Sequence, residues 1–139
     1  MKILVIEDQE GPWSNFLTIL LQMCHIPAEN IIRARWYTEA QAKIEEGQYD
    51  IVFLDHRMPY DDPGCTDDME TFDKFCRTLQ NIGYGLLSSI REKQPQAKIV
   101  GTSSLSGGEI GRFEKPEVTL TKINLFDELP PLIESFLAK

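Results

Sequence analysis

Long apolar runs are missing from this sequence of 139 residues. Runs such as Ile51 to Leu54 reach only four residues, whereas a membrane-spanning helix needs about 20. The amino-terminal Met-Lys-Ile-Leu-Val-Ile leads directly into the acidic pair Glu7-Asp8, without the apolar stretch and cleavage site of a signal peptide. The sequence therefore favours a cytoplasmic protein without membrane insertion.

Cysteine and clustered basic residues are also scarce. The three cysteines, Cys24, Cys65 and Cys76, form an odd set without Cys-x-x-Cys spacing, which argues against a disulfide framework and a zinc site. The net charge is −8, and Lys and Arg do not gather into a stripe, so direct nucleic-acid binding is not expected. The acidity favours a bound cation or a basic partner surface instead.

Short β-branched runs alternate with stretches of helical spacing. Strands are predicted at 3–6, 31–36, 50–55, 98–102 and 118–121. Helices are predicted after Gly11-Pro12, from a capping box at Thr38–Gln41 to a stop at Gly47, across 69–94, and at the C-terminus with Pro130-Pro131 in the first turn. Between 103 and 116 only a short, mobile helix is expected. This alternation predicts one α/β domain over residues 1–139, with a parallel sheet and helices on both faces.

Polar side chains stand where the predicted strands end, which is where sites form in open α/β sheets. Glu7-Asp8 follow the first strand and Asp55 the third, while Thr102 and Lys122 end the fourth and fifth. If the first and third strands are neighbours, three carboxylates converge and repel one another unless a cation lies among them. All-oxygen ligands suit Mg²⁺ or Mn²⁺, and the hydroxyl and ammonium could hold phosphoryl oxygens.

Each of these residues also has a purely structural alternative. The strand-end acids could be helix N-caps, Thr102 could cap a turn, and Lys122 could be solvated surface. His56, next to Asp55, is expected to be structural or solvent-facing. The two tryptophans, Trp13 and Trp36, are expected to pack rather than to bind a ligand.

Four motifs in order carry a resemblance to a known family. They are Val-Ile-Glu-Asp at 5–8, Val-Phe-Leu-Asp-His-Arg-Met-Pro at 52–59, Gly-Thr-Ser at 101–103 and Thr-Lys-Ile at 121–123. Together they make the chain similar to the response-regulator receiver domains of two-component signalling, from Lys2 to Leu137. The resemblance implies a flavodoxin-like, doubly wound fold with five parallel strands.

The resemblance also implies roles for the residues at the strand ends. Asp55 would accept a phosphoryl group from a phosphohistidine of a histidine kinase or histidine phosphotransfer protein, and an unknown downstream protein would respond. Thr102 would hydrogen-bond the phosphoryl group and Lys122 would pair with it. The magnesium ligands would be Glu7, Asp8, Asp55 and the backbone carbonyl of Arg57.

The sequence departs from the family in three places. Ile123 follows the lysine where the family has proline, and Thr119 stands where the family has a switch aromatic, which puts the usual coupling in doubt. Gly85, the counterpart of the glycine that begins the family's third helix, follows Asp55 by 30 residues, so residues 60–84 are interpreted as inserted.

The inserted segment carries an apolar stripe at helical spacing, formed by Met69, Phe72, Phe75, Cys76, Leu79 and Ile82. The stripe predicts an extra helix beside the site. That helix could be an elongated third helix packed on the domain, or a lid or docking surface.

Three other functions compete with a phosphorylated receiver. A haloacid-dehalogenase-type phosphatase would carry a second aspartate two residues after the first, where this chain has Arg57. A pseudo-receiver would bind partners without phosphorylation, which the retained acids, Thr102 and Lys122 argue against. A flavin-binding flavodoxin would not end its first strand in acids.

Overall fold

The computed structural model describes residues 1–65, 71–102, 113–114 and 116–138. Its main sheet has five strands in the order β2-β1-β3-β6-β7, and every neighbouring pair is parallel. The strands are β1 Ile3–Ile6, β2 Ile31–Ala34, β3 Ile51–Leu54, β6 Lys98–Gly101 and β7 Val118–Thr119. This order confirms the predicted doubly wound sheet and places the topological switch point between β1 and β3.

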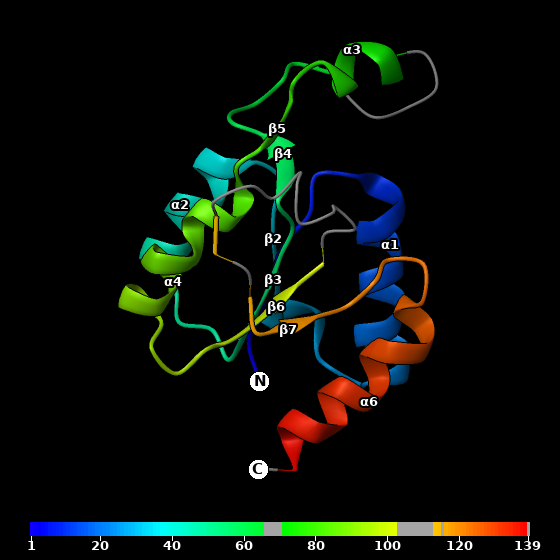
Figure 1. Ribbon diagram of the computed structural model, residues 1–139. Helices are drawn as coiled ribbons and strands as arrows, with labels where there is room; N and C mark the ends of the chain where they lie inside the picture. The colour runs from blue at the N-terminus through cyan, green and yellow to red at the C-terminus, as the bar shows by residue number, and fades with distance from the viewer. Residues whose placement is uncertain (66–70, 103–112, 115, 139) are drawn as a thin grey trace.

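Helices cover both faces of the sheet (Figure 1). The four larger ones are α1 Glu10–Thr18, α2 Tyr37–Glu46, α4 Leu87–Lys93 and α6 Leu125–Leu137. Side chains of β1 alternate between the faces: Ile3 and Val5 pack toward α1 and α6, while Leu4 and Ile6 pack toward α2 and α4. Because β3 alternates in the same way, the two central strands are buried on both sides, which explains their unbroken apolar runs.

The capping box predicted at Thr38 is wrong. The N-cap of α2 is Trp36 and makes no side-chain cap bond. Instead the Thr38 amide donates to the backbone oxygen of Tyr60 at 2.9 Å, and the Tyr37 and Tyr60 rings stack with centroids 5.4 Å apart. A distant segment therefore satisfies an amide of the first helical turn that the sequence assigned to a local cap. The predicted stop at Gly47 is confirmed.

Pro130 and Pro131 do not lie in the first turn of the last helix, as the sequence predicted. The helix α6 begins at Leu125, where the Asp127 and Glu128 amides donate to the Asn124 carbonyl, so the two prolines are interior. Neither proline can donate an amide, so the carbonyls of Phe126 and Asp127 lose their intrahelical partners. The buried face formed by Leu125, Leu129 and Ile133 anchors the helix in spite of this loss.

The inserted segment contains a short helix and one strand of an antiparallel ribbon rather than one long helix. Strands β4 Arg57–Pro59 and β5 Leu79–Asn81 pair with each other. Between them the five-residue helix α3, Phe72–Cys76, ends where Thr78 bonds to the Phe75 carbonyl through its amide and hydroxyl. A 3₁₀ turn at Gly83–Leu86 then leads into α4. The helical character predicted across 69–94 is confirmed in α3 and α4 but is wrong at β5, which separates the two helices. Met69 lies outside the described residues.

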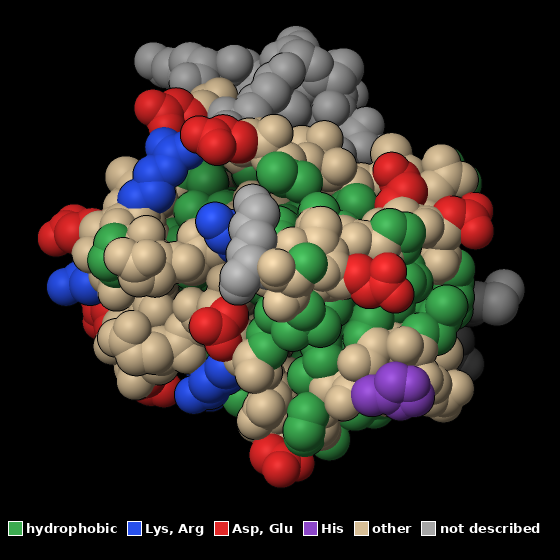
Figure 2. Space-filling view, turned by 90° about the horizontal axis from the view of Figure 1, so that it is seen from below, with side chains coloured by type: hydrophobic (Ala, Val, Ile, Leu, Met, Phe, Trp, Pro, Cys, Tyr) green, Lys and Arg blue, Asp and Glu red, His purple; other side chains and the backbone are tan. Residues whose placement is uncertain are grey.

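The ribbon and α3 lie at one end of the molecule, and the chain termini lie near the other (Figure 1). The ribbon and α3 rise beyond the carboxyl ends of the strands (Figure 1). At the opposite end, near the termini, acidic and basic side chains are scattered among hydrophobic and neutral ones (Figure 2). Among the described helices, none is both long and apolar enough to cross a bilayer.

Candidate functional site: an acidic pocket with one lysine

Three carboxylates meet at the carboxyl ends of β1 and β3. Glu7, Asp8 and Asp55 each place one carboxylate oxygen within 4.8 Å of the other two. All three residues are buried. The register of the two strands explains the meeting, because Ile6 lies beside Leu54 and the acids follow directly. The sequence prediction that these side chains converge is confirmed.

Lys122 reaches into the cluster from the segment after β7. Its Nζ lies 2.8 Å from Asp55 Oδ2 and 2.9 Å from Glu7 Oε2. The lysine side chain is only 23% exposed, so the alternative of a solvated surface lysine is wrong. One ammonium among three carboxylates leaves an excess of negative charge, which favours a bound cation or protons.

Burial and mutual repulsion raise the carboxyl pKa values. Burial, with a further contribution from the charge of Asp55, raises the pKa of Glu7 to about 7. Burial, followed by the charges of Glu7 and Asp55, raises the pKa of Asp8 to about 8. Burial alone would lower the pKa of Lys122, but Asp55 and Glu7 outweigh it and raise that pKa above its ordinary value. The lysine therefore stays charged, while Glu7 and Asp8 of the metal-free protein tend to hold protons near neutral pH.

We expect the stability of the metal-free protein to fall as pH rises from about 4 to 8. Glu7 and Asp8 have folded-state pKa values above their ordinary values of 4.5 and 3.8, so the folded state retains protons that the unfolded state has lost. The free energy of unfolding should fall by up to about 1.4 kcal/mol per pH unit for each such group. Urea unfolding at a series of pH values measures this slope.

Added Mg²⁺ is expected to oppose that trend, because an ion held by these residues would favour their deprotonated forms. The gain in stability from Mg²⁺ should be larger at pH about 8 than at pH about 5, where protons compete with the ion. Asp8→Asn is the matched control, since it removes one titrating group and one ligand together. A pH-independent stability in this range, or an equal Mg²⁺ effect in Asp8→Asn, would contradict the prediction.

Among the described residues, two polar atoms of the pocket have neither a hydrogen-bond partner nor an ion-pair partner. They are Asp8 Oδ2 and Thr102 Oγ1, both buried; Glu7 Oε2 likewise has no hydrogen-bond partner, but it lies 2.9 Å from the Lys122 ammonium. Thr102 is fixed by its amide, which donates to the Leu54 carbonyl at 3.0 Å, and its hydroxyl does not cap a turn in the described residues. The N-cap of α1 is Gln9, so Asp8 is not a helix cap. A buried carboxylate oxygen without a partner, as in Asp8, suits a magnesium ion, and a buried hydroxyl without a partner, as in Thr102, suits a bound anion.

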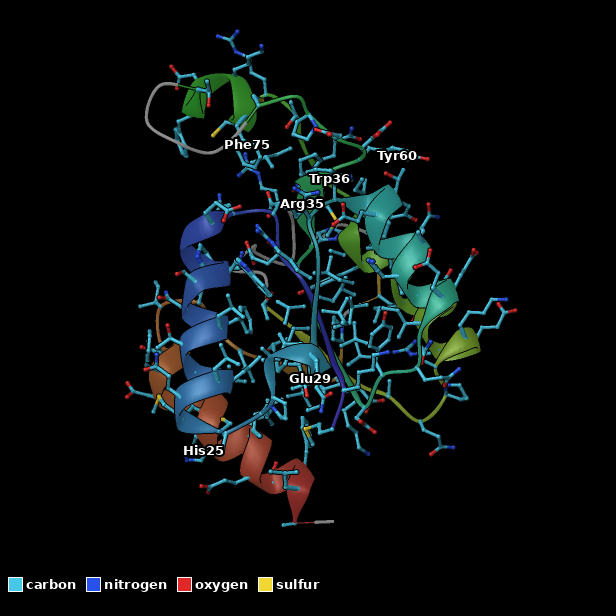
Figure 3. All side chains as sticks on the ribbon, turned by 180° about the vertical axis from the view of Figure 1, so that it is seen from behind. His25, Glu29, Arg35, Trp36, Tyr60 and Phe75 are labelled. Carbon is cyan, nitrogen blue, oxygen red and sulfur yellow. The ribbon has the colours of Figure 1, made fainter. Side chains whose placement is uncertain are left out.

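Arg57 begins β4 with an exposed side chain and pairs with Asn81 in the ribbon. Its carbonyl as a metal ligand stays a prediction. A pocket of about 240 Å³ lies beside the acids, and its lining includes Asp8, Arg35, Trp36 and Phe75. Phe75 from α3 and the Arg35–Trp36 pair lie at the same end of the molecule (Figure 3).

Sequence reasoning missed the structural roles of His56 and Gly83 beside Asp55. His56 is fully buried, so the solvent-facing alternative for this residue is wrong. Gly83 approaches so closely that a Cβ there would collide with the backbone oxygen of Asp55 and lie 2.8 Å from the Cα of His56. A sequence signal for this close approach exists in the two glycines at 83 and 85, since glycine allows backbone segments to lie close together. From the sequence, a role is assigned to Gly85 alone.

Gly83→Ala is expected to destabilise the protein by about 3 kcal/mol or more, because backbone must move to admit the methyl group. Gly85→Ala is the matched control: its Cβ would meet first the ring of Phe113, at 3.2 Å, which is a side chain that can yield. Urea unfolding of both variants gives the comparison. Equal stability of the two alanine variants would show that the contact with Asp55 is not tight in solution.

Solved structures similar to this chain are receiver domains of response regulators. The response regulator TrrA of Thermotoga maritima, in complex with Mg²⁺-BeF, has 24% identity and a TM-score of 0.63, covering 98% of this chain and 99% of that chain. The BeF₃-activated DrrB receiver domain has 18% identity and a TM-score of 0.66, covering 99% and 97%. A CheY-like receiver domain from Methylobacillus flagellatus has 21% identity and a TM-score of 0.63, covering 98% of both chains.

The chain has the receiver-domain fold. No protein-family model matches it, and no curated protein matches it by sequence. A receiver fold alone does not determine chemistry, so the function has to be argued from the acidic pocket. Residues 60–84, which include α3 and β5, are the part of the chain that the sequence predicted to be inserted relative to the family.

Proposed function

We propose that this chain is a phospho-acceptor receiver of a two-component or phosphorelay system, in which Asp55 takes a phosphoryl group from phosphohistidine. One observation carries the proposal: in a receiver fold, the Asp55 carboxylate lies 2.8 Å from the Lys122 ammonium and shares a buried pocket with two further acids. The donor would be a histidine kinase or a histidine phosphotransfer protein in the cytoplasm. Phosphorylation would then switch the binding of a downstream protein.

The reaction is an in-line transfer in which positioning and charge stabilisation do most of the catalysis. An Asp55 carboxylate oxygen forms a bond to phosphorus while the bond from phosphorus to the donor's imidazole nitrogen breaks, and the imidazole leaves with the electron pair. The His56 amide donates to Asp55 Oδ1 at 2.8 Å and holds the carboxylate in place. Lys122 would pair with the transferred group, and the unpartnered Thr102 hydroxyl would donate to it.

Magnesium fits the donor set of the pocket. Asp8, Glu7 and Asp55 offer hard carboxylate oxygens that lie close together. The Lys122 ammonium balances only part of the negative charge of these three acids. Among the described residues, Asp8 Oδ2 has no hydrogen-bond partner. When bound, Mg²⁺ would neutralise charge on the phosphoryl oxygens. Mn²⁺ suits the same ligands.

Incubation with acetyl phosphate and Mg²⁺, followed by intact-mass measurement, tests the proposal. The chain should gain the mass of one phosphoryl group and lose it slowly after the donor is removed. Absence of any gain, with Mg²⁺ bound, would favour the alternative of a pseudo-receiver. A dehalogenase-type phosphatase is disfavoured because the position of its second aspartate holds Arg57, whose side chain is exposed.

We also propose that the inserted segment, residues 60–84, carries part of the partner-binding surface. It starts five residues after Asp55, Tyr60 contacts the start of α2, and Phe75 lines the pocket beside Asp8. The side chains of Phe72 and Tyr60 are each 47% exposed. A protein bound at Asp55 would therefore meet aromatic side chains of this segment.

A further inference from the structure

His56 connects the acceptor aspartate to the far end of the inserted segment through its backbone. Its amide donates to Asp55 Oδ1 at 2.8 Å. Its carbonyl accepts hydrogen bonds from the amides of Ile82 and Gly83, at 3.0 and 2.7 Å. The backbone of His56 thus contacts the Asp55 carboxylate through its amide and the end of the inserted segment through its carbonyl.

The His56 ring makes a second set of contacts with the same returning segment. Its Nδ1 accepts a hydrogen bond from the Tyr84 amide at 2.9 Å. The ring stacks on Tyr84 with centroids 4.5 Å apart, and the edge contact with Phe113 has a centroid distance of 4.9 Å. Full burial of His56 means that these contacts decide where the residue sits, since solvent does not reach it.

Tyr84 also reaches the end of β6, directly before Thr102. A Cβ on Gly101 would lie 2.9 Å from the Tyr84 hydroxyl oxygen, so the tyrosine is packed against the backbone just before Thr102. His56 and Tyr84 therefore fill the space between the Asp55 loop and the end of β6. Tight packing of this kind transmits displacement, because neither side has room to relax separately.

We propose that His56 is a positioning residue for phosphorylation of Asp55, held in place by the returning segment Ile82–Tyr84. This inference rests on the proposed function. The His56 amide sets the orientation of the Asp55 carboxylate, and the contacts with Tyr84 set the position of that amide. The rate of phosphoryl transfer consequently depends on contacts made by the end of an insertion that supplies no reacting group.

Two substitutions at His56 separate this role from simple packing. His56→Phe keeps an aromatic ring against Tyr84 but removes the acceptor for its amide. His56→Asn loses the ring but places an amide oxygen near the position of Nδ1, so it can still accept from Tyr84. The initial rate of labelling is measured over a series of acetyl phosphate concentrations, with Mg²⁺ affinity followed by Trp13 fluorescence.

His56→Phe should lower the maximal labelling rate by about tenfold while leaving Mg²⁺ affinity and the half-saturating acetyl phosphate concentration unchanged. His56→Asn should keep most of the wild-type maximal labelling rate, because it can still accept the hydrogen bond from the Tyr84 amide. If the wild-type chain is labelled and both variants match it, His56 does not position Asp55 and this inference fails alone. If the wild-type chain is not labelled, the proposed function fails as well.

Hydrogen exchange on the unmodified chain provides a test that does not depend on how the variants fold. Binding of beryllofluoride, a phosphoryl mimic, at Asp55 should change the exchange rates of the Ile82, Gly83 and Tyr84 amides. Unchanged rates at these three amides, with beryllofluoride bound, would overturn the proposed link.

Discussion

Asp55→Asn is expected to abolish labelling by acetyl phosphate. The asparagine amide cannot form the acyl phosphate, and it also loses the negative charge that pairs with Lys122 at 2.8 Å. Neighbouring acids should not substitute for Asp55. Glu7 and Asp8 follow β1 rather than β3, and in the proposed function they hold Mg²⁺ rather than receive the phosphoryl group. Intact mass after incubation with acetyl phosphate and Mg²⁺ measures the loss.

Asp73→Asn is the matched control, because Asp73 is an exposed acid on α3. It should be labelled as the wild-type chain is, which would also show that one charge on the insertion does not control the chemistry. Circular dichroism should show that Asp55→Asn remains folded, so that loss of labelling is not loss of structure. Undiminished labelling of Asp55→Asn would place the acceptor at another carboxylate, and peptide mapping would identify it.

Lys122→Met is expected to produce the largest loss of stability among single substitutions in the pocket. Removal of one partner from a buried ion pair leaves uncompensated charge, at a cost of about 3–5 kcal/mol. Because the Lys122 side chain is 23% exposed, we expect about 2–4 kcal/mol at pH about 8. The loss should be smaller below the Glu7 pKa of about 7, where a proton neutralises the Glu7 carboxylate that the lysine no longer pairs.

Urea unfolding of Lys122→Met beside Lys93→Met separates the pocket from general charge effects, since Lys93 is an exposed lysine in the last turn of α4. Addition of Glu7→Gln to Lys122→Met should recover part of the lost stability, because it removes one of the unpaired carboxylates. Similar unfolding free energies for the two lysine variants would mean that the ion pairs with Asp55 and Glu7 contribute little.

The strands and the acidic pocket could be predicted because both follow from short-range pattern. A central strand that is buried on both faces is an unbroken apolar run, and Ile51–Leu54 has no other plausible role. Once β1 and β3 are neighbours, the acids that follow them must converge. The meeting of Glu7, Asp8 and Asp55 therefore needed only the strand ends and the parallel topology.

The inserted segment could not be predicted in the same way, because its contacts join residues distant in sequence. Phe72, Phe75 and Leu79 have helical spacing, yet pairing of Leu79 with Pro59 outweighs that local preference. The Tyr60 carbonyl receives an amide of α2, which no local capping pattern indicates. Similarly, the two prolines of α6 lie inside a helix because packing of its apolar face compensates for the lost hydrogen bonds.

The pairing of β4 with β5 brings together the chain on either side of residues 60–78, since Pro59 and Leu79 face each other in the ribbon. The chain leaves the domain and re-enters it at adjacent points, so the length of the intervening stretch is independent of the spacing between Asp55 and α4. Residues 61–78 could be replaced by a tight turn or by a fluorescent reporter without a change in strand register. The molecule thus offers an attachment point for a fluorescent reporter a few residues after Asp55.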